Sequence, residues 1–239
     1  MSLPFFYVHE LNDQTIQLDE DTSKHIINVL RMSKGEPLLL TDGFGKKAEA
    51  VILDDNRKKC IVRTYKTITE EKPKPSIYIG ISLIKNSSRF EWFLEKAAEI
   101  GVGGIIPLLC ERTEKEKFRI DRMQHILTSA MLQSQQCWLT FLHEPREFKS
   151  VVIENTYDVK LIGHCMESEK KDLSTLLPNL VTSSITSCII LIGPEGDFSQ
   201  NEITFSINKG FNPVSLGNTR LRTETAGMVA AAMLCSVRS

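Results

Sequence analysis

The N-terminal part of the chain, to about residue 70, alternates short apolar runs with polar positions, and turn residues separate several of the runs. One helix is expected there, from about Asp21 to Met32, with Ile26, Ile27 and Leu30 on one side. Asp42-Gly43-Phe44-Gly45 predicts a hairpin, because glycine tolerates the positive φ of tight turns. The expected strands are residues 5–11, 15–18, 36–43, 47–54 and 59–66. Short strands at this spacing predict a small β-barrel.

A polar segment with two prolines follows, Glu70-Glu71-Lys72-Pro73-Lys74-Pro75. Proline fixes φ and has no amide donor, so it is poorly suited to the interior of a helix or a strand. We therefore expect a domain boundary here, with residues 1–72 in one domain and residues 73–239 in the other.

Beyond the prolines, continuous apolar runs alternate with segments of helical spacing. The clearest helices are expected at residues 87–101 and 121–138, and Ser199 with Glu202 forms a capping box that starts another at about Gln200. The expected strands are residues 77–84, 104–109, 157–163, 188–193 and 213–217. This alternation predicts an α/β domain with a parallel sheet and helices on both faces.

Composition is that of an ordinary soluble globular protein, with 41% apolar and 25% charged residues. No apolar run approaches the roughly 18 residues that span a bilayer, and the N-terminus lacks the pattern of a signal peptide, so no membrane segment is expected. The six cysteines are scattered, which indicates reduced thiols and a cytoplasmic protein. A formal net charge of −1 gives no global sign of nucleic-acid binding, so any RNA site must be a local patch.

Two glycine-bearing loops, Gly193–Gly196 and Leu216–Gly227, each follow an expected strand and lead into an expected helix. Ligands of open α/β sheets bind outside the carboxyl ends of the strands, so the two loops are candidates for one pocket. The first loop is equally compatible with a tight turn that binds nothing. The second holds two arginines, one glutamate and several hydroxyl groups within ten residues, which favours a functional site. Thr223 is expected to cap the following helix, and Glu224 to lie at the positive end of its dipole.

Several enzyme classes lack their motifs in this chain. There is no GxxxxGK[ST] phosphate loop, no GxGxxG dinucleotide fingerprint and no GxSxG nucleophile elbow. The five histidines show no HExxH or other metal-ligand spacing, so no metal is expected. His164 and Cys165 are adjacent, but neighbours in a strand point to opposite faces, which argues against a nucleophile pair.

The C-terminal pair of motifs is specific. LIGPEGDFSQNEI followed by SLGNTRLRTETA closely resembles the RsmE family of 16S ribosomal RNA (uracil-N3)-methyltransferases, within the SPOUT superfamily. HIINVLRMSKGE, TDGFGKKAEA, ISLIKNSSRFEWFLEKAAEIGV and the region around SAMLQSQQ extend the resemblance over most of the chain. It implies a PUA-like β-barrel for RNA at residues 1–72 and a SPOUT methyltransferase domain with a trefoil knot at residues 73–239. It also implies S-adenosylmethionine as the cofactor, 16S ribosomal RNA or the 30S subunit as the substrate, and a homodimer.

The resemblance also suggests site residues. Arg222 is the candidate that stabilises the uracil anion, and Glu195 or Glu224 could assist removal of its proton. The residues assigned to RNA are His25, Arg31, Lys34 and Arg89, and for the N-terminal ones a solvated charged face is the alternative. The residues expected to hold the cofactor are Leu161, Ile162, Gly163, Ile192, Gly193, Pro194, Gly196, Leu216, Gly217, Leu221, Thr223 and Thr225.

Two positions depart from the usual family pattern. Asp197 stands where a second glycine is usual, which removes the backbone freedom of that glycine and offers an acid near a helix N-terminus. Gln136 stands where an arginine is usual, so that arginine is not available for an RNA phosphate. Two other functions stay open on the sequence alone: a non-catalytic RNA-binding or ribosome-assembly factor that keeps the fold, and a small-molecule α/β enzyme that uses a nucleotide.

Overall fold

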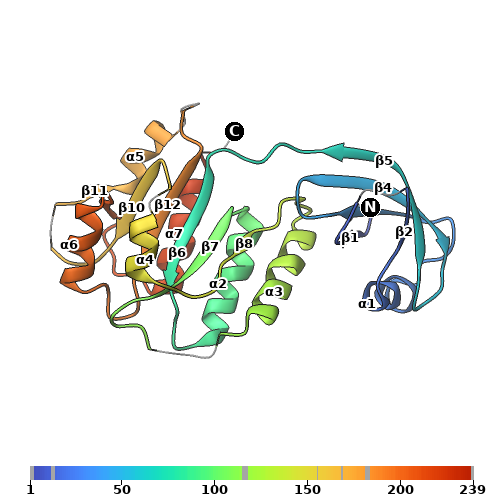
Figure 1. Cartoon of the computed structure of the whole chain (residues 1–239), viewed down its shortest axis with the longest axis horizontal. Coiled ribbons are helices and arrows are strands. Elements are labelled where there is room, and N and C mark those ends of the chain that lie inside the picture. The colour runs from blue at the N-terminus through green and yellow to red at the C-terminus, as the bar shows by residue number, and fades with distance from the viewer. Residues whose placement is uncertain are drawn as a thin grey trace. The chain divides into compact units, whose positions relative to one another are not determined.

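The chain folds into two units, each with its own sheet (Figure 1). A computed structural model describes residues 3–11, 14–114, 118–154, 156–167, 169–180 and 184–237. The first unit comprises Met1–Lys72 together with Met131–Leu139, which we call the return segment. The second comprises Pro73–Ala130 and Thr140–Ser239. The division after Lys72 coincides with the proline linker, whereas a single boundary there would put the return segment in the second unit.

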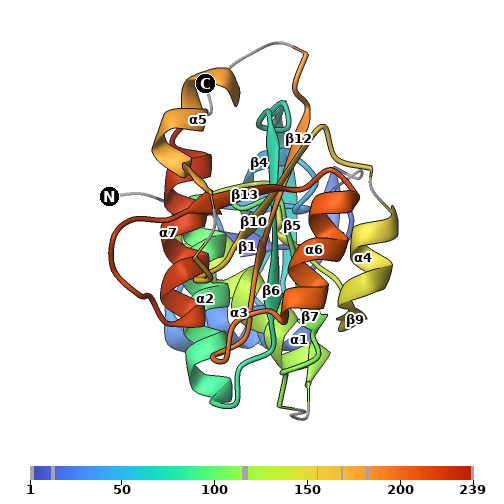
Figure 2. The ribbon, with the colours of Figure 1, turned by 90° about the vertical axis from the view of Figure 1, so that its left-hand side faces the viewer.

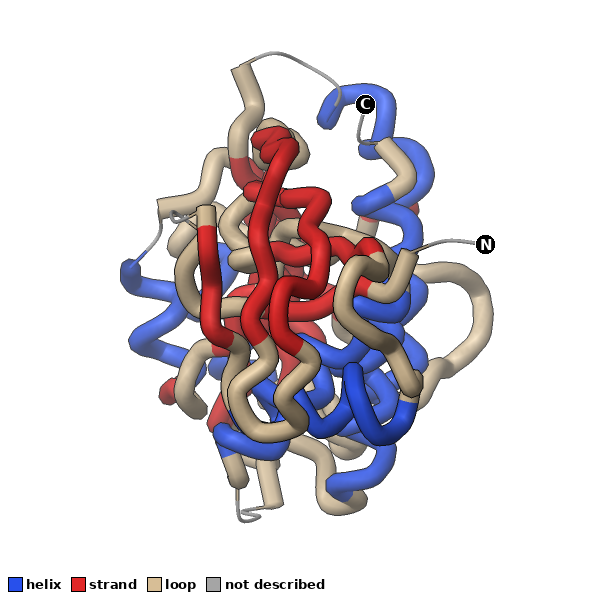
Figure 3. The backbone as a smooth tube through the Cα atoms, turned by 90° about the vertical axis from the view of Figure 1, so that its right-hand side faces the viewer, coloured by secondary structure: helices blue, strands red, loops and turns tan. Residues whose placement is uncertain are grey.

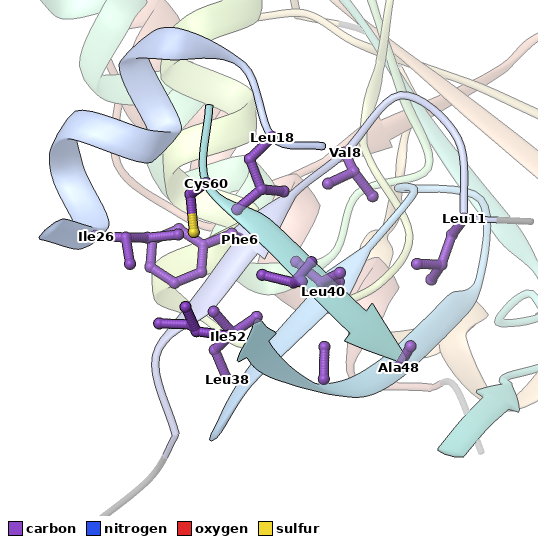
Figure 4. Close-up of a cluster of buried hydrophobic side chains, with 12 residues drawn as sticks. Phe6, Val8, Leu11, Leu18, Ile26, Leu38, Leu40, Ala48, Ile52 and Cys60 are labelled. Carbon is purple, nitrogen blue, oxygen red and sulfur yellow. The ribbon is translucent and has the colours of Figure 1, made fainter. Parts of the chain in front are cut away.

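The first unit contains a five-stranded sheet in the order β1-β3-β4-β5-β2. Its strands, among those drawn in red in Figure 3, are antiparallel except for the parallel pair β1 and β3. Side chains alternate across the pleat, so Leu38, Leu40 and Ile52 of β3 and β4 enter one buried core (Figure 4). The bounds are β1 (Phe5–Tyr7), β2 (Thr15–Gln17), β3 (Pro37–Thr41), β4 (Lys46–Asp54) and β5 (Ile61–Thr69).

The helix of the first unit changes its winding halfway. α1 (Glu20–Lys24) continues directly as the π-helix η1 (His25–Val29). Ile26 is fully buried, whereas Leu30 is 43% exposed, so the expectation that both lie on one side is wrong for Leu30. A π-turn contains more residues than an α-turn, and the 3.6-residue periodicity therefore fails here. Arg31 leaves the helix with a φ of 57°, a left-handed conformation that side chains rarely adopt.

The expected hairpin at residues 42–45 is present, and the return segment packs on it. Gly43 and Gly45 have φ values of 72° and 94°. The Leu139 N–H donates to the Gly43 carbonyl, and the Gly45 N–H donates to the Cys137 carbonyl, each at 2.9 Å. A Cβ on Gly45 would lie 2.5 Å from the Trp138 ring. Glycine at position 45 is thus required both by its φ and by this close approach.

The second unit contains an eight-stranded sheet with the path β11-β13-β10-β12-β6-β7-β8, from which β9 pairs separately with β7. Its strand pairs among the described residues are all parallel, as predicted. The five long strands match the continuous apolar runs, while the three two-residue strands carry no pattern. The bounds are β6 (Ser76–Ser82), β7 (Gly104–Leu109), β8 (Phe141–Leu142), β9 (Arg146–Glu147), β10 (Val159–Gly163), β11 (Lys171–Asp172), β12 (Ser187–Ile192) and β13 (Asn212–Ser215).

Helices cover both faces of this sheet, with α2 and α7 on one side and α4 and α6 on the other (Figure 2). Asn86 rather than a serine caps α2, and Gly101 ends it in the left-handed conformation, as expected. The bounds are α2 (Ser87–Ile100), α3 (Ile120–Gln133), α4 (Phe148–Glu154), α5 (Leu173–Leu180), α6 (Gln200–Asn208) and α7 (Thr223–Cys235).

Small residues let α7 approach its neighbours closely. A Cβ on Gly227 would lie 2.7 Å from the Phe93 ring of α2 and 2.8 Å from the Ile81 side chain of β6. Ala230 and Ala231 are also fully buried. Packing inside one chain therefore accounts for the small residues at these three positions.

Candidate active site

A pocket of about 620 Å³ lies at the carboxyl ends of β10, β12 and β13. These three strands are parallel neighbours in the sheet, so the loops that follow them converge. The walls come from residues 163–165 and 170, 192–195 and 197, and 214–223 and 226. The pocket volume is in the range typical of small-molecule and cofactor sites. The two glycine-bearing loops therefore share one pocket, as the sequence predicts.

Most of the residues assigned to the cofactor line this pocket, and a few do not. Those in its walls are Gly163, Ile192, Gly193, Pro194, Leu216, Gly217, Leu221 and Thr223. Those not among its lining residues are Leu161, Ile162, Gly196 and Thr225. Leu161 and Ile162 are buried in the body of β10, because the strand continues to Gly163 before it reaches the pocket.

The chemistry of the walls suits a flat, uncharged ring with a polar extension. Ile192 and Val214 are buried apolar residues at the strand ends. Gly217 has a φ of 123°, and a Cβ there would have no heavy atom within 4 Å, so the backbone at this point is open to a ligand. Arg220 and Arg222 are exposed and add charge to the loop after β13. Apolar ends of strands with charged groups on the surrounding loop are what an adenosine-containing cofactor with a charged tail would need.

The loop after β12 is held tightly from within the chain. A Cβ on Gly193 would lie 3.0 Å from the Phe198 backbone nitrogen, so glycine here permits a sharp turn. The Thr223 hydroxyl donates to the Gly193 carbonyl at 3.0 Å, which ties the loop to the start of α7. The capping box of α6 forms as predicted between Ser199 and Glu202. The helix begins at Gln200.

Thr223 therefore does not cap α7, contrary to the expectation. Arg222 occupies the N-cap position in an extended conformation, and its side chain makes no capping hydrogen bond. Arg222 is exposed and lines the pocket at the start of the helix. The Thr223 hydroxyl points instead to the loop after β12.

Asp197 adopts the conformation of the glycine that it replaces. Its φ is 64°, in the left-handed region that aspartate visits more readily than most residues. Its carboxylate accepts hydrogen bonds from the Cys165 N–H at 2.8 Å and the Phe198 N–H at 2.9 Å. The expectation that Asp197 serves the N-terminus of α6 is thus wrong, because its carboxylate connects two pocket loops.

His164 and Cys165 follow β10 rather than lying within it, and both line the pocket. His164 is 8% exposed and Cys165 is exposed, so the two side chains do not face one another. Lys170 donates to the His164 carbonyl at 3.0 Å and to the Met166 carbonyl at 2.8 Å. Burial, with a contribution from the Lys170 charge, holds the pKa of His164 below its usual value, although Asp197 opposes this.

Glu195 and Glu224 are placed differently. Glu195 is exposed, lines the pocket, and accepts a hydrogen bond from the Lys85 N–H at 3.3 Å. Glu224 is 7% exposed and is not among the pocket residues. One of its oxygens lies 3.7 Å from the Arg89 Nε, and the other is buried without a hydrogen-bond partner among the described residues. Arg89, assigned to RNA, is therefore paired with a carboxylate in this structure.

The remaining RNA candidates lie in the first unit. His25, Arg31 and Lys34 are all exposed, on η1 and in the turn after it. The His25 ring packs edge-on against Phe6, with their centroids 6.1 Å apart. Gln136, where the family usually has arginine, donates to the Ser134 hydroxyl at 2.8 Å.

Several pocket residues had no role in the sequence-based assignment. They are His164, Cys165, Lys170, Asp197, Val214, Ser215, Asn218, Thr219, Arg220 and Ala226. The rule that ligands bind beyond strand ends could have identified those directly after β10, since the end of that strand was predicted at Gly163. The same rule could not have identified Lys170, because this residue lines the pocket but does not directly follow a strand.

The described part of the chain has neither a candidate metal-binding cluster nor a membrane-spanning helix. No group of three or more histidine, cysteine, aspartate or glutamate residues there could hold a metal ion. None of the helices in it combines the length and the apolar character needed to cross a bilayer.

The sequence and the fold are similar to those of known proteins. Residues 70–235 match the model of an RNA methyltransferase domain, and residues 18–65 match that of an RNA methyltransferase PUA domain. The chain is 31% identical to ribosomal RNA small subunit methyltransferase E of Synechocystis, over 94% of this chain and 74% of that protein.

Two solved structures are similar over almost their whole length. A probable rRNA-methyltransferase from Porphyromonas gingivalis has a TM-score of 0.87 and 35% identity, with 98% of each chain covered. A ribosomal RNA small subunit methyltransferase E from Neisseria gonorrhoeae, bound to S-adenosylmethionine, has a TM-score of 0.85 and 26% identity, again with 98% of each chain covered.

Proposed function

The chain belongs to the RNA methyltransferase family, and we propose that it methylates nitrogen 3 of a uridine in 16S ribosomal RNA, with S-adenosylmethionine as the methyl donor. The pocket at the ends of β10, β12 and β13 is the observation that carries this proposal. The small-subunit relatives point to 16S ribosomal RNA, and we take the assembled 30S subunit as the substrate. Six free cysteines are in keeping with a reaction in the reducing cytoplasm.

The cofactor would be held mainly by the ends of the strands. Ile192, Leu216 and Leu221 offer apolar contact, and the open space beside Gly217 lets a ligand approach the backbone. S-adenosylmethionine supplies a methyl group that is already activated by its sulfonium. The task left to the protein is to position the acceptor nitrogen and to manage its proton.

In our proposal Glu195 removes the proton from the uracil ring, and Arg222 stabilises the anion that results. Nitrogen 3 of neutral uracil carries a proton, and the ring becomes anionic when that proton leaves. Arg222 lines the pocket and is exposed, so its guanidinium can stabilise the anion or orient the uracil carbonyls. Of the two glutamates considered, Glu195 lines the pocket and Glu224 does not, which favours Glu195 as the base.

A trefoil knot is the part of the fold that we propose from the resemblance and from one feature of the topology. After β13 at one side of the sheet, the chain returns through residues 216–222 to α7, which packs against the central strands β6 and β12. The Thr223–Gly193 hydrogen bond lies where this returning chain passes the loop after β12. An experimental structure traced continuously from β10 to α7 will show whether the chain is knotted.

We also propose that the protein acts as a homodimer, on the resemblance alone. Light scattering of the purified chain at several concentrations measures its oligomeric state. A monomer at concentrations where methylation is fully active would contradict this part of the proposal.

Arg222→Ala tests the proposed reaction. We expect methyl transfer to 30S subunits to fall by about 100-fold or more, while titration calorimetry finds S-adenosylmethionine affinity within about twofold of wild type. Arg220→Ala is the matched control, because Arg220 is an exposed arginine of the same loop and also lines the pocket. Loss of cofactor binding in Arg222→Ala would assign that residue to the cofactor instead.

The same methyl-transfer and binding assays, applied to the wild-type protein, distinguish the alternative functions. Cofactor binding without transfer to either free 16S RNA or 30S subunits would favour a non-catalytic assembly factor. Transfer to free RNA but not to subunits would contradict the assembled substrate while leaving the reaction intact.

A further inference from the structure

One polar side chain in the pocket wall has no structural task. We infer that His164 hydrogen-bonds the adenosine part of the bound cofactor, and that Asp197 and Lys170 hold the turn that carries it. This inference rests on the proposed function, since it takes S-adenosylmethionine as the ligand of the pocket.

The burial of His164 is the first observation. The residue is 8% exposed, and neither ring nitrogen has a hydrogen-bond partner among the described residues. A buried polar group without a partner costs about 1–3 kcal/mol, so such groups persist where a ligand or function uses them. The residue also lines the pocket, and rotation about its soft Cβ–Cγ torsion can turn a ring nitrogen towards the ligand.

The second observation is that the backbone around His164 is fastened from two directions. Asp197 accepts the Cys165 N–H at 2.8 Å, from the loop after β12. Lys170 donates to the carbonyls of His164 and Met166 from farther along the chain. All three polar groups of this turn are therefore bound by charged side chains, which places the imidazole before the ligand arrives.

Charge decides which part of the cofactor meets the imidazole. The methionine end carries an ammonium and a carboxylate, which are costly to bury and suit the solvent-exposed part of the pocket at residues 217–219 of the loop after β13. Adenosine is uncharged, and its ring and ribose offer both hydrogen-bond donors and acceptors. His164, beside the buried apolar ends of β12 and β13, meets that uncharged part.

The protonation state of His164 fits this assignment. Burial and Lys170 lower its pKa below the ordinary value, and Asp197 opposes them, so the neutral ring is favoured. A neutral imidazole has one donor and one acceptor. It also adds no further positive charge to a pocket that must accept a sulfonium.

The test measures binding by the full chain, without any need for turnover. We expect His164→Leu to bind S-adenosylmethionine and 5′-methylthioadenosine about three- to tenfold more weakly than wild type. 5′-Methylthioadenosine retains adenosine and lacks the amino-acid end, so equal losses for both ligands locate the contact at adenosine. A loss of affinity for S-adenosylmethionine alone would show that the contact is not at adenosine. Unchanged affinity for both ligands would overturn the inference.

Thermal unfolding of the free protein distinguishes ligand contact from a structural role. The Tm of His164→Leu should equal or exceed that of wild type, because an unsatisfied buried polar group is removed. A clearly lower Tm with weaker binding would indicate a structural residue. His143→Leu is the matched control, because His143 is a partly buried histidine that does not line the pocket. An equal loss of affinity in it would assign the effect to general destabilisation rather than to the imidazole of His164.

The pH dependence supplies a second readout. Protonation of His164 removes its acceptor and adds a cation to the pocket. Because burial lowers its pKa below the ordinary value of about 6.5, wild-type affinity for S-adenosylmethionine should fall as the pH is lowered below about 6.5. In His164→Leu this dependence should be reduced. The same dependence in both proteins would contradict the inference, whereas failure of the wild type to bind the cofactor at any pH would contradict the proposed function itself.

Discussion

Three of the described residues other than glycine have a left-handed backbone conformation: Arg31, Gln135 and Asp197 have φ values of 57°, 58° and 64°. Asp197 lines the pocket. Arg31 follows a π-helix, a form that often occurs at functional sites. Aspartate adopts this conformation more readily than most residues, whereas arginine disfavours it, so the conformation of Arg31 does not follow from local sequence preference.

Arg31→Ala should weaken binding to 16S ribosomal RNA in a salt-dependent way. If Arg31 contacts one phosphate, the slope of log affinity against log salt should fall in magnitude by about 1. Arg31→Lys retains the charge and should keep most of the slope. Filter binding across a range of salt concentrations measures both, and an unchanged slope in the alanine variant would remove Arg31 from the RNA surface.

Asp197 permits a matched comparison of side chain and backbone. Asp197→Gly loses the two carboxylate hydrogen bonds but relieves the backbone, whereas Asp197→Ala loses the same bonds and keeps a Cβ at positive φ. We expect the alanine variant to be about 1 kcal/mol less stable than the glycine variant in urea unfolding. Equal stability of the two would show that the loop relaxes to another conformation.

At the scale of elements, α7 is the helix that connects the pocket to the rest of its unit. Its first turn carries Arg222 at the N-cap, the Thr223 bond to Gly193, and the Glu224–Arg89 pair to α2. Its middle packs against α2 and β6 at Gly227. The position of Arg222 in the pocket therefore depends on how closely α7 approaches α2.

Gly227→Ala should destabilise the second unit despite the better helix propensity of alanine. The added methyl would lie within 2.8 Å of Phe93 and Ile81, which are fully buried and cannot move aside cheaply. We expect a loss of about 1–3 kcal/mol in the free energy of unfolding, together with weaker cofactor binding. Ala232→Ser on the exposed side of the same helix should change stability by less than about 0.5 kcal/mol.

Strand positions could be read from the sequence, whereas contacts between distant helices could not. The continuous apolar runs correspond to β6, β7 and β12, because a strand buried on both faces needs apolar residues at nearly every position. Glu224 has the sequence features of an N-terminal helix acid. Its pairing with Arg89 depends on α2 and α7 being neighbours, which no local pattern encodes. The hydrogen bond from the Cys165 N–H to the Asp197 carboxylate could not be predicted either, because it joins two loops that are distant in the sequence.

At the scale of the whole molecule, the chain leaves the first unit at the prolines and later returns to it. The return segment supplies Cys137, Trp138 and Leu139 to the hairpin of the first unit. The sequence of the return segment has no feature that relates it to residues 42–45. The composition of the proline linker predicts a single domain boundary, with the return segment in the second domain. Such long-range contacts are decided by the packed structure rather than by periodicity.

Comparison of Gly45→Ala with Gly35→Ala measures how strongly the packing of the return segment restricts the hairpin of the first unit. Both glycines have nearly the same φ, 94° and 92°, but a Cβ on Gly45 would lie 2.5 Å from Trp138 and one on Gly35 would meet nothing within 4 Å. We expect about 1–2 kcal/mol of strain in Gly35→Ala, and at least about 1 kcal/mol more in Gly45→Ala. Urea unfolding followed by Trp138 fluorescence checks this. Equal losses would mean that the indole moves away without cost.

The return segment also imposes an order on biosynthesis. Residues 1–72 emerge from the ribosome first, but the hairpin lacks its partners until Leu139 has also emerged. At about 5–20 residues per second, this wait lasts on the order of several seconds. During that interval the nascent first unit leaves the Gly43 carbonyl and the Gly45 N–H without their final partners. The proline linker and the strand β6 meanwhile leave the exit tunnel, so assembly of the second unit begins before the first is complete.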